Sequence, residues 1–319
     1  MRALLAATAL ALATPLAAQD STAQDRAAQV TAAFEGWLAD NAIAEASIAV
    51  ITNGTQPVTK GYGRDADAPV TLASLSKAIT GACVAVLQQE GVFDLDSEIS
   101  DLIDAPTGSG SLPDFLSQTS GFQDDPTQGQ PWHLAADRTP RHALASKLAL
   151  DAPRGDATFR YNNANFAVLG ALIDAVAQHD YFTDCRDLVL APLGITTAAP
   201  DPVWGPLGAW GGWEMSVGDY ARFAKEWFGT NRNIGRAPLN WPHAELNGGA
   251  HYLMGAFHRN IRGRDLFWHA GLLCWDGTGD GSYFASYNGD VVVAVSYAAC
   301  LPDGALGDLD AALFNAAMR

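Results

Sequence analysis

The chain has 319 residues, of which 48% are hydrophobic and 17% charged, so it can bury a sizeable core and is not disordered by composition. Its length indicates one large domain or two intertwined ones. Acidic residues outnumber basic ones by 35 to 19, which gives a formal net charge of −16. This charge argues against nucleic-acid binding and against an anionic membrane surface as a partner.

The first eighteen residues have the pattern of a secretory signal peptide. Met1 and Arg2 give a short positive start, and a mostly apolar stretch follows from Ala3 to Ala18. The pattern predicts cleavage after Ala18, so residues 1–18 are the signal peptide and residues 19–319 the exported domain. An N-terminal helix is the alternative interpretation. No later apolar run is long enough to span a bilayer.

Strand and helix patterns begin in the first third of the chain. Helical spacing of apolar residues runs from Ala27 to Ala42. Ala46–Thr52 and Pro57–Tyr62 are separated by Asn53-Gly54 and predict a β-hairpin. A helical pattern then runs from Ser74 to Glu90 and stops at Gly91.

The rest of the chain divides into a helical middle and a strand-rich end. Residues 92–200 alternate short helical pieces with loops rich in Pro, Gly and Asp, and contain no strand run. Val217–Phe228 predicts a helix. Ser282–Tyr287 and Asp290–Ala298 flank Asn288-Gly289 and predict a second hairpin. Leu306–Met318 predicts a final amphipathic helix.

Strands at both ends with helices between them predict an α+β fold. We expect an antiparallel sheet built from both termini and flanked by helices. Residues 19–75 and 201–319 form this α/β body, and residues 76–200 form a mostly helical inserted subdomain. The cleft between the two parts is the expected ligand site.

The four cysteines fit an exported protein, because an oxidising compartment permits disulfides and they lack the close pairs of a zinc site. Three pairings are possible. We favour Cys274–Cys300, since both residues end neighbouring predicted strands, which leaves Cys83–Cys185 as the remainder. Four buried thiols remain the alternative.

Ser74 and Lys77 are the sharpest chemical feature of the sequence. At the start of a helix, residues three apart share a face, so the hydroxyl and the amine point the same way. The helix N-terminus favours negative charge near Ser74, and a buried lysine can lose its proton and activate the hydroxyl. Taken alone, a capping serine beside a solvated lysine is the commoner arrangement.

Two further motifs follow in chain order. Tyr161 and Asn163 precede an apolar helical start, and a tyrosine hydroxyl near a cationic lysine is a candidate general base. His269 and Gly271 open the C-terminal strand region, where a glycine lets a substrate approach the backbone and a following N–H can join that of Ser74 in an oxyanion hole. A core tyrosine and a structural histidine are the alternatives.

Ser-x-x-Lys, Tyr-x-Asn and His-x-Gly in this order resemble the motifs of the penicillin-recognising serine hydrolases. The similarity is greatest to the class C β-lactamase-related branch, which includes family VIII carboxylesterases and D-Ala-D-Ala carboxypeptidases. Further segments resemble family landmarks: Glu90–Asp96, Phe115–Gly121 with Gln118 where His is usual, Pro192–Gly194 and Gly211–Asp219.

The resemblance implies a β-lactamase/transpeptidase-like fold and an acyl-enzyme mechanism. It implies Ser74 as nucleophile, Lys77 in proton transfer, and Tyr161 as base and then as acid to the leaving group. Asn163 is expected to hydrogen-bond Lys77 or the substrate carbonyl. The oxyanion donors are expected to be the N–H groups of Ser74 and of Leu272, next to Gly271. His269 stands where lactamases of this group carry Lys, which favours an esterase or peptidase.

Other chemistries lack their signatures. The sequence contains neither the Gly-x-Ser-x-Gly elbow of α/β-hydrolases nor a His-Glu-x-x-His pair. Residues 276–281 start like a calcium loop, but Tyr287 stands where the loop needs Glu. We expect no metal and no cofactor. Trp275 is one of several tryptophans that line an aromatic cleft or pack in ordinary core.

These observations predict an exported bacterial serine hydrolase, periplasmic or secreted, that acts on a small-molecule ester, amide or peptide through a Ser74 acyl-enzyme. A true β-lactamase or a D-Ala-D-Ala carboxypeptidase is the alternative within the class. A catalytically inactive relative that binds cell wall or protein is the alternative outside it.

Overall fold

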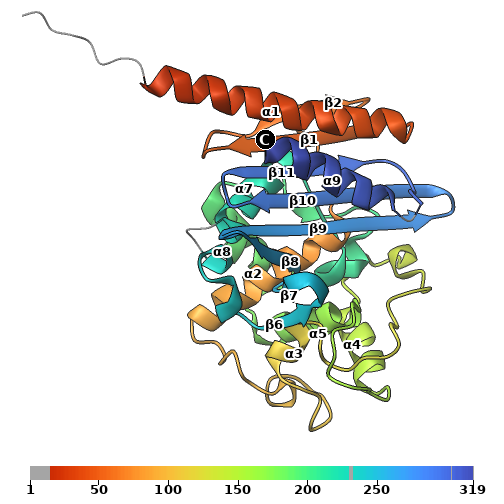
Figure 1. Cartoon of the computed structure of the whole chain (residues 1–319). Helices are drawn as coiled ribbons and strands as arrows, with labels where there is room; N and C mark the ends of the chain where they lie inside the picture. Colours follow the sequence, from red (N-terminus) through yellow and green to blue (C-terminus); the bar gives the residue numbers. More distant parts are fainter. Residues whose placement is uncertain (1–14, 230–232, 303, 319) are drawn as a thin grey trace, which may run out of the picture.

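One eight-stranded antiparallel sheet with helices on both faces forms the frame of the molecule (Figure 1). The computed structural model describes residues 15–229, 233–302 and 304–318. Helices α1 and α9 cover one face of the sheet, and α7 with the helix-rich middle of the chain covers the other. Each face buries its own cluster of hydrophobic side chains.

The strands of this sheet lie in the order β2-β1-β11-β10-β9-β8-β7-β6. Segments from the two ends of the chain therefore lie side by side, because β1 pairs with β11 as the second and third strands of the sheet. The bounds are β1 (Ala46–Thr52), β2 (Val58–Tyr62), β6 (His243–Leu246), β7 (Ala250–Leu253), β8 (Ala256–Ile261), β9 (Arg264–Trp275), β10 (Thr278–Tyr287) and β11 (Val291–Tyr297). The predicted α+β fold, with an antiparallel sheet built from both termini, is confirmed.

Residue type explains the central strands. Every residue of β1 and β11 is buried, and both strands are rich in Val and Ile, which suits strands covered on both faces. Asn288 and Gly289 both have positive φ in the turn between β10 and β11, as a tight hairpin requires. The predicted hairpin is therefore present.

Strands β6, β7 and β8 are a difference from the sequence prediction, which placed no strand at residues 243–261. They are four to six residues long and mix histidine and arginine with aromatic side chains, so their alternation is weak. Met254 and Gly255, both with positive φ, form the two-residue turn between β7 and β8.

The terminal helices lie side by side on one face of the sheet (Figure 1). Helix α1 (Pro15–Asp40) begins well before the predicted Ala27 and ends two residues before the predicted Ala42, which has φ of +53°. Helix α9 is Ala305–Ala317. Residues 1–14 of the expected signal peptide lie outside the described residues, and its cleavage after Ala18 stays a prediction.

The middle of the chain is helical, as expected. Its elements are η1 (Ala73–Leu75), α2 (Ser76–Gln89), η2 (Ile99–Asp101), α3 (Leu112–Leu116), η3 (Trp132–Leu134), α4 (His142–Leu150), α5 (Ala164–Val176), α6 (Tyr181–Cys185), η4 (Arg186–Leu190) and η5 (Ala191–Leu193). Then follow η6 (Gly205–Trp210), α7 (Val217–Phe228), α8 (Asn233–Arg236), η7 (Pro238–Asn240) and η8 (Asn247–Gly249). No helix in the described ranges has both the length and the hydropathy to cross a membrane.

A small three-stranded sheet joins the helical middle to the rest. It has the order β3-β5-β4, with β3 (Val70–Thr71), β5 (Trp213–Met215) and β4 (Ala199–Pro200). The two residues of β4 lie inside the range expected to be helical. The division of the chain at residues 75/76 and 200/201 stays a prediction.

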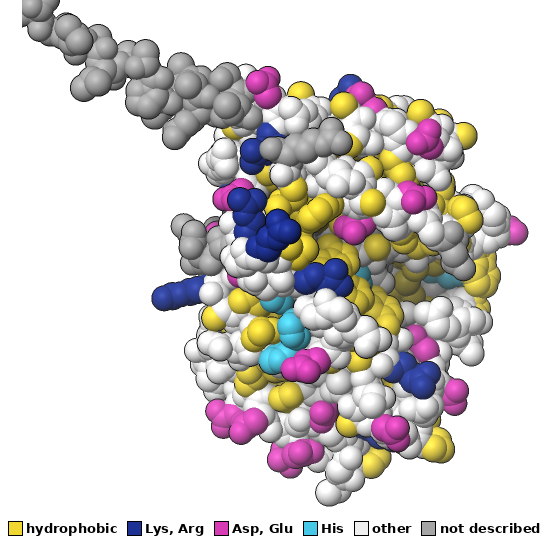
Figure 2. All heavy atoms as spheres, viewed as in Figure 1, with side chains coloured by type: hydrophobic (Ala, Val, Ile, Leu, Met, Phe, Trp, Pro, Cys, Tyr) yellow, Lys and Arg dark blue, Asp and Glu magenta, His cyan; other side chains and the backbone are white. Residues whose placement is uncertain are grey.

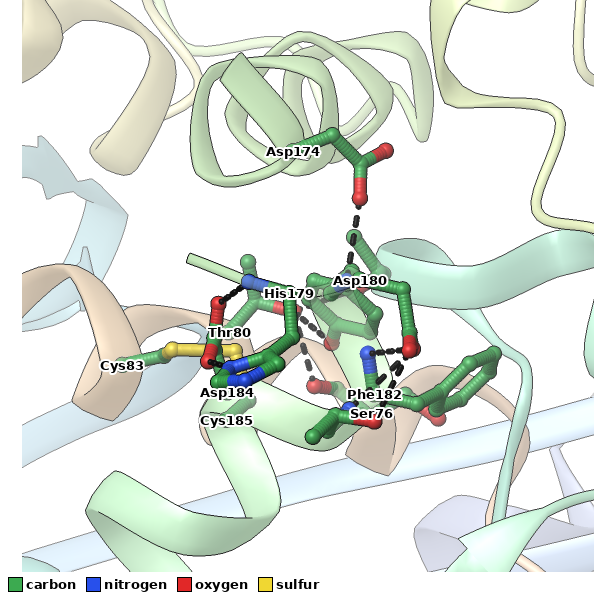
Figure 3. The surroundings of a disulfide bond; sticks show 12 residues. Ser76, Thr80, Cys83, Asp174, His179, Asp180, Phe182, Asp184 and Cys185 are labelled. Atoms are coloured by element: carbon green, nitrogen blue, oxygen red, sulfur yellow. Dashed lines mark hydrogen bonds and ion pairs between the residues drawn. A yellow bond between two sulfur atoms is a disulfide. The ribbon is translucent and has the colours of Figure 1, made fainter. Parts of the chain in front are cut away.

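Two disulfides are present, in the pairing that the sequence favours. Cys83–Cys185 ties α2 to α6, and Cys274–Cys300 ties the end of β9 to the segment after β11. Figure 3 shows the first bond, with Thr80 one turn earlier on α2. The Thr80 hydroxyl lies 2.7 Å from the Tyr181 hydroxyl of α6. The middle of helix α2, which directly follows the candidate nucleophile, is therefore tied to α6 by a disulfide and a hydrogen bond.

Candidate active site

Ser74 lies in η1, directly before α2, and Lys77 lies in the first turn of α2. Lys77 is fully buried, and its Nζ donates hydrogen bonds to Ser74 Oγ at 3.0 Å and to the Trp210 carbonyl at 2.8 Å. Burial lowers the pKa of Lys77 to about 7, against the opposing charge of Asp125. An appreciable fraction of Lys77 is therefore an uncharged amine near neutral pH.

The backbone around Ser74 is held in an uncommon conformation. Ala73, the residue before it, is buried and has φ of +47°, a left-handed conformation that non-glycine residues seldom adopt. Strand β9 packs directly on this turn: a Cβ at Gly271 would lie 2.8 Å from Ala73 Cβ and 2.8 Å from the Leu72 carbonyl oxygen. Gly271 is therefore required by this close approach, which brings the backbone of Leu272 beside the Ser74 turn.

Tyr161 lies just before α5 and faces the same space. Its hydroxyl is 3.1 Å from His269 Nε2, and Lys77 Nζ lies 5.2 Å from the centre of its ring. Desolvation raises the pKa of the Tyr161 hydroxyl, although hydrogen bonding with Ser74 opposes the rise. Tyr161 as a whole keeps 39% of its surface exposed, and its part in proton transfer stays a prediction.

His269 is buried in β9 and is held in one tautomer. Its Nδ1 lies 2.6 Å from the Gly255 carbonyl oxygen, which can only accept, so Nδ1 carries the proton and Nε2 accepts from the Tyr161 hydroxyl. Burial and the nearby Lys77 lower the pKa of His269 to about 3. The imidazole is therefore neutral, and it does not supply the positive charge that a lysine at this place would.

Of the two contacts expected of Asn163, the hydrogen bond to Lys77 is not made in the described residues, and the bond to a substrate carbonyl stays a prediction. The two hydrogen-bond acceptors of Lys77 in the described residues are Ser74 and Trp210. The Asn163 backbone N–H donates to Asp125 Oδ2 at 3.0 Å. The side-chain oxygen Oδ1 of Asn163 is buried and has no hydrogen-bond partner among the described residues.

Gln118 shapes the Tyr161 segment, a role that the sequence did not reveal. It is buried with φ of +64°, and its Oε1 accepts from the Asn162 backbone N–H and from Asn165 Nδ2, both at 2.8 Å. The only signal in the sequence was a glutamine where the family loop usually has histidine. Asp125, which faces Lys77 and holds Asn163, carried no signal.

A second missed group, the buried His142, lies behind Lys77. His142 Nδ1 is 2.7 Å from Asp174 Oδ2, and its Nε2 accepts from the Ala209 backbone N–H at 2.8 Å. A Cβ at Gly170 would lie 2.6 Å from the imidazole ring, and one at Gly208 only 2.0 Å from it. The imidazole therefore fixes the segment whose next carbonyl, that of Trp210, accepts from Lys77.

Comparisons with known proteins agree with this geometry. A family model described as Beta-lactamase matches residues 27–316. The curated Protein flp of Staphylococcus aureus is 28% identical over 190 residues, which is 54% of this chain but only 38% of that protein. The chain therefore matches well under half of the length of this relative.

Solved structures share the fold at low sequence identity. The octameric penicillin-binding protein homologue of Pyrococcus abyssi has a TM-score of 0.71 and 19% identity, over 90% of this chain and 77% of that one. The D-amino acid amidase of Ochrobactrum anthropi SV3 has a TM-score of 0.74 and 15% identity, over 90% of this chain and 98% of that one. The class C beta lactamase of Rhodobacter sphaeroides has a TM-score of 0.70 and 16% identity, over 91% of this chain and 99% of that one.

The fold is thus β-lactamase/transpeptidase-like, and a serine lies beside a buried lysine where η1 meets α2. Over most of its length, the chain belongs to the Beta-lactamase family.

Proposed function

We propose that the protein is an exported serine hydrolase that cleaves an ester or amide bond through an acyl-enzyme on Ser74. The observation that carries the proposal is the 3.0 Å contact between Ser74 Oγ and Lys77 Nζ, with the lysine fully buried. An uncharged amine at this distance can accept the hydroxyl proton as the oxygen attacks. Membership of the Beta-lactamase family supports this class of reaction.

The proton route follows from the state of each group. Lys77 accepts the Ser74 proton as Oγ bonds to the carbonyl carbon. When the tetrahedral intermediate collapses, the bond to the leaving group breaks, and the leaving group takes a proton from the Tyr161 hydroxyl. The Lys77 ammonium then returns a proton to Tyr161. Water attacks the acyl-enzyme by the same steps in reverse and regenerates Ser74.

This route differs from the sequence-based expectation in the identity of the base. A tyrosine whose hydroxyl pKa is raised by desolvation stays protonated near neutral pH and so has a proton to donate, whereas the lysine with a pKa of about 7 has an uncharged fraction that can accept one. His269 accepts from Tyr161 and orients its hydroxyl. The N–H groups of Ser74 and Leu272 are the proposed oxyanion donors, because β9 packs on the Ser74 turn at Gly271.

Covalent labelling tests the proposal. A fluorophosphonate reagent should add one equivalent to the mature protein, as measured by intact mass. Peptide mapping after digestion should then locate the adduct on Ser74. The Ser74→Ala variant should stay unlabelled. Ser76→Ala is the matched control, because it makes the same substitution two residues away. The Ser76 hydroxyl accepts from the Trp213 N–H instead of bonding Lys77. Equal labelling of wild type and Ser74→Ala would rule out this nucleophile.

A further inference from the structure

In the described ranges, one edge of strand β9 has no pairing strand beyond the point where β8 ends. Strand β8 pairs with β9 only as far as Trp268, opposite Phe257, whereas β10 pairs with β9 through Trp275. From His269 to Trp275, no strand of the described residues pairs with the other edge of β9. This open edge starts beside Tyr161 and passes the Ser74 turn at Gly271.

Side chains alternate between the two faces of a strand, so His269, Gly271, Leu273 and Trp275 lie on one face. His269 contacts Tyr161, Gly271 packs on the Ser74 turn, and Leu273 packs on the core of the helical side. Trp275 is four residues beyond Gly271, which corresponds to about 13 Å along the strand.

The proposed proton route gives the substrate a direction along this edge. Tyr161 protonates the leaving group, so the leaving group lies at the His269 end. The carbonyl carbon lies near Ser74 and Gly271. The acyl chain must then leave in the opposite direction, toward Leu273 and Trp275. This step rests on the proposed function.

An aromatic wall, defined here as His133, Trp204 and Trp275, stands at that end. The His133 ring lies 4.5 Å from the Trp204 ring and 4.6 Å from the Trp275 ring, centre to centre. His133 and Trp204 are buried, whereas Trp275 keeps 43% of its surface exposed. Figure 2 shows that hydrophobic side chains gather around hollows on the face viewed there. The exposed ring of Trp275 is available to an apolar group of a substrate.

Three contacts make the wall rigid. The Cys274–Cys300 disulfide holds the strand end next to Trp275. The Trp204 side chain, from the segment between β4 and η6, hydrogen-bonds the Asp280 side chain of β10. Arg138 donates to the His133 carbonyl and to the Val203 carbonyl, so it joins the two loops that supply the buried rings. A preorganised wall loses little entropy when a ligand binds.

The charges around the wall favour an uncharged acyl group. Asp280 lies behind Trp204, and Asp276 follows Trp275 directly. The Arg138 guanidinium is engaged by two backbone carbonyls. Burial and the Arg138 charge lower the pKa of His133, so its ring is neutral at physiological pH. An acyl chain that ends in a carboxylate would therefore meet the carboxyl groups of Asp276 and Asp280, and the one cation that faces Asp280 in the described residues, Arg64, is already paired electrostatically with it.

We infer that the aromatic wall is the acyl subsite of the enzyme and that its substrates are esters or amides of carboxylic acids with an uncharged aryl or arylalkyl chain. The aryl ring stacks on Trp275, and the chain between ring and carbonyl lies along β9 past Leu273.

Three p-nitrophenyl esters with one leaving group test the inference: the butyrate, the 5-phenylvalerate, and the monoester of a dicarboxylic acid of similar length. We expect the wild-type kcat/KM for the phenylvalerate to exceed that for the butyrate by roughly tenfold or more, as ring stacking and burial of the extra apolar surface imply. The carboxylate ester should be the poorest of the three.

Trp275→Ala should bring the phenylvalerate-to-butyrate ratio close to one. Trp241→Ala is the matched control, a tryptophan beside β6, and should leave the ratio unchanged. If wild type hydrolyses both esters through Ser74 with equal kcat/KM, or if Trp275→Ala keeps the preference, the acyl subsite is wrong while the hydrolase assignment stands. If no ester is hydrolysed in a Ser74-dependent manner, the proposed function itself fails.

Discussion

At the scale of single residues, the site depends on two side chains whose burial makes them neutral. Lys77 is fully buried and has a pKa of about 7, and His269 has a pKa of about 3. In water both would carry more charge at the same pH. Burial therefore turns the lysine into a base for Ser74 and the imidazole into an acceptor for Tyr161.

This state of Lys77 predicts the pH dependence of kcat/KM for a simple ester. Only the deprotonated amine can accept the Ser74 proton, so kcat/KM should rise tenfold per pH unit below about pH 7 and level off above it. His269 titrates too low to add a second limb between pH 5 and pH 9. Lys77→Arg should lose at least about a hundredfold, because a guanidinium does not deprotonate. A flat profile, or a limb near pH 10, would contradict this role.

At the scale of elements, helix α2 packs against neighbours of two kinds. Some can be predicted from a local sequence pattern, and others cannot. The α2 helix, the α7 helix and both hairpins follow from apolar periodicity and Asn-Gly turns, which are local properties. The short strands β6 to β8 have no such signal, yet their Met254-Gly255 turn packs on α2. A Cβ at Gly255 would lie 2.3 Å from the Lys77 carbonyl oxygen.

The same difference separates the predicted site residues from the missed ones. The predicted residues belong to short motifs whose residue types indicate a reaction: Ser74, Lys77, Tyr161 and His269. The structure brings them together. His142, in contrast, acts only through contacts distant in sequence, with Asp174 and with the Ala209 backbone. Glycines at 170 and 208 make room for its ring, and nothing local reveals that purpose.

His142 is a positioning residue for Lys77, and this makes a prediction about the pH profile. His142→Leu removes the acceptor of the Ala209 N–H, loosens the Trp210 carbonyl and admits water to Lys77. Hydration relieves the desolvation that lowers the lysine pKa, so the limb of kcat/KM should move to higher pH. His142→Gln, whose amide can bond both partners, should restore much of the wild-type profile.

The pair of an exposed His179 and a largely buried Asp184 provides the matched control for this experiment. His179 Nδ1 lies 2.9 Å from Asp184 Oδ1, but the His179 side chain is 61% exposed and far along the chain from Lys77. His179→Leu should leave the limb where it is. A purely structural role for His142 would lower stability or kcat without moving the limb, and that result would contradict the positioning role.

At the scale of the whole molecule, two covalent links join segments that are distant in the chain. Cys83–Cys185 closes a separation of 102 residues inside the helical middle, and all of its side-chain surface is buried. Cys274–Cys300 closes 26 residues at an exposed strand end. A longer closed loop restricts the unfolded chain more. The first bond should therefore contribute more to stability.

Urea unfolding of two double variants measures this difference. Chain-entropy scaling predicts that replacing Cys83 and Cys185 by Ala lowers the free energy of unfolding by about 1 kcal/mol more than replacing Cys274 and Cys300. Loss of buried sulfur packing adds to the effect of the first pair. Equal losses, or a greater loss for the exposed pair, would contradict the account of how the helical middle is held.

The central claim is that turnover passes through an acyl-enzyme on Ser74, and the most direct measurement is a pre-steady-state burst. Mature protein at micromolar concentration, mixed with p-nitrophenyl butyrate, should release nitrophenolate with a burst amplitude near one equivalent per active site, followed by slower steady turnover. Ser74→Ala should show neither phase, and Ser76→Ala should show both. A burst of the same size in Ser74→Ala, or steady turnover that does not depend on Ser74, would contradict the account.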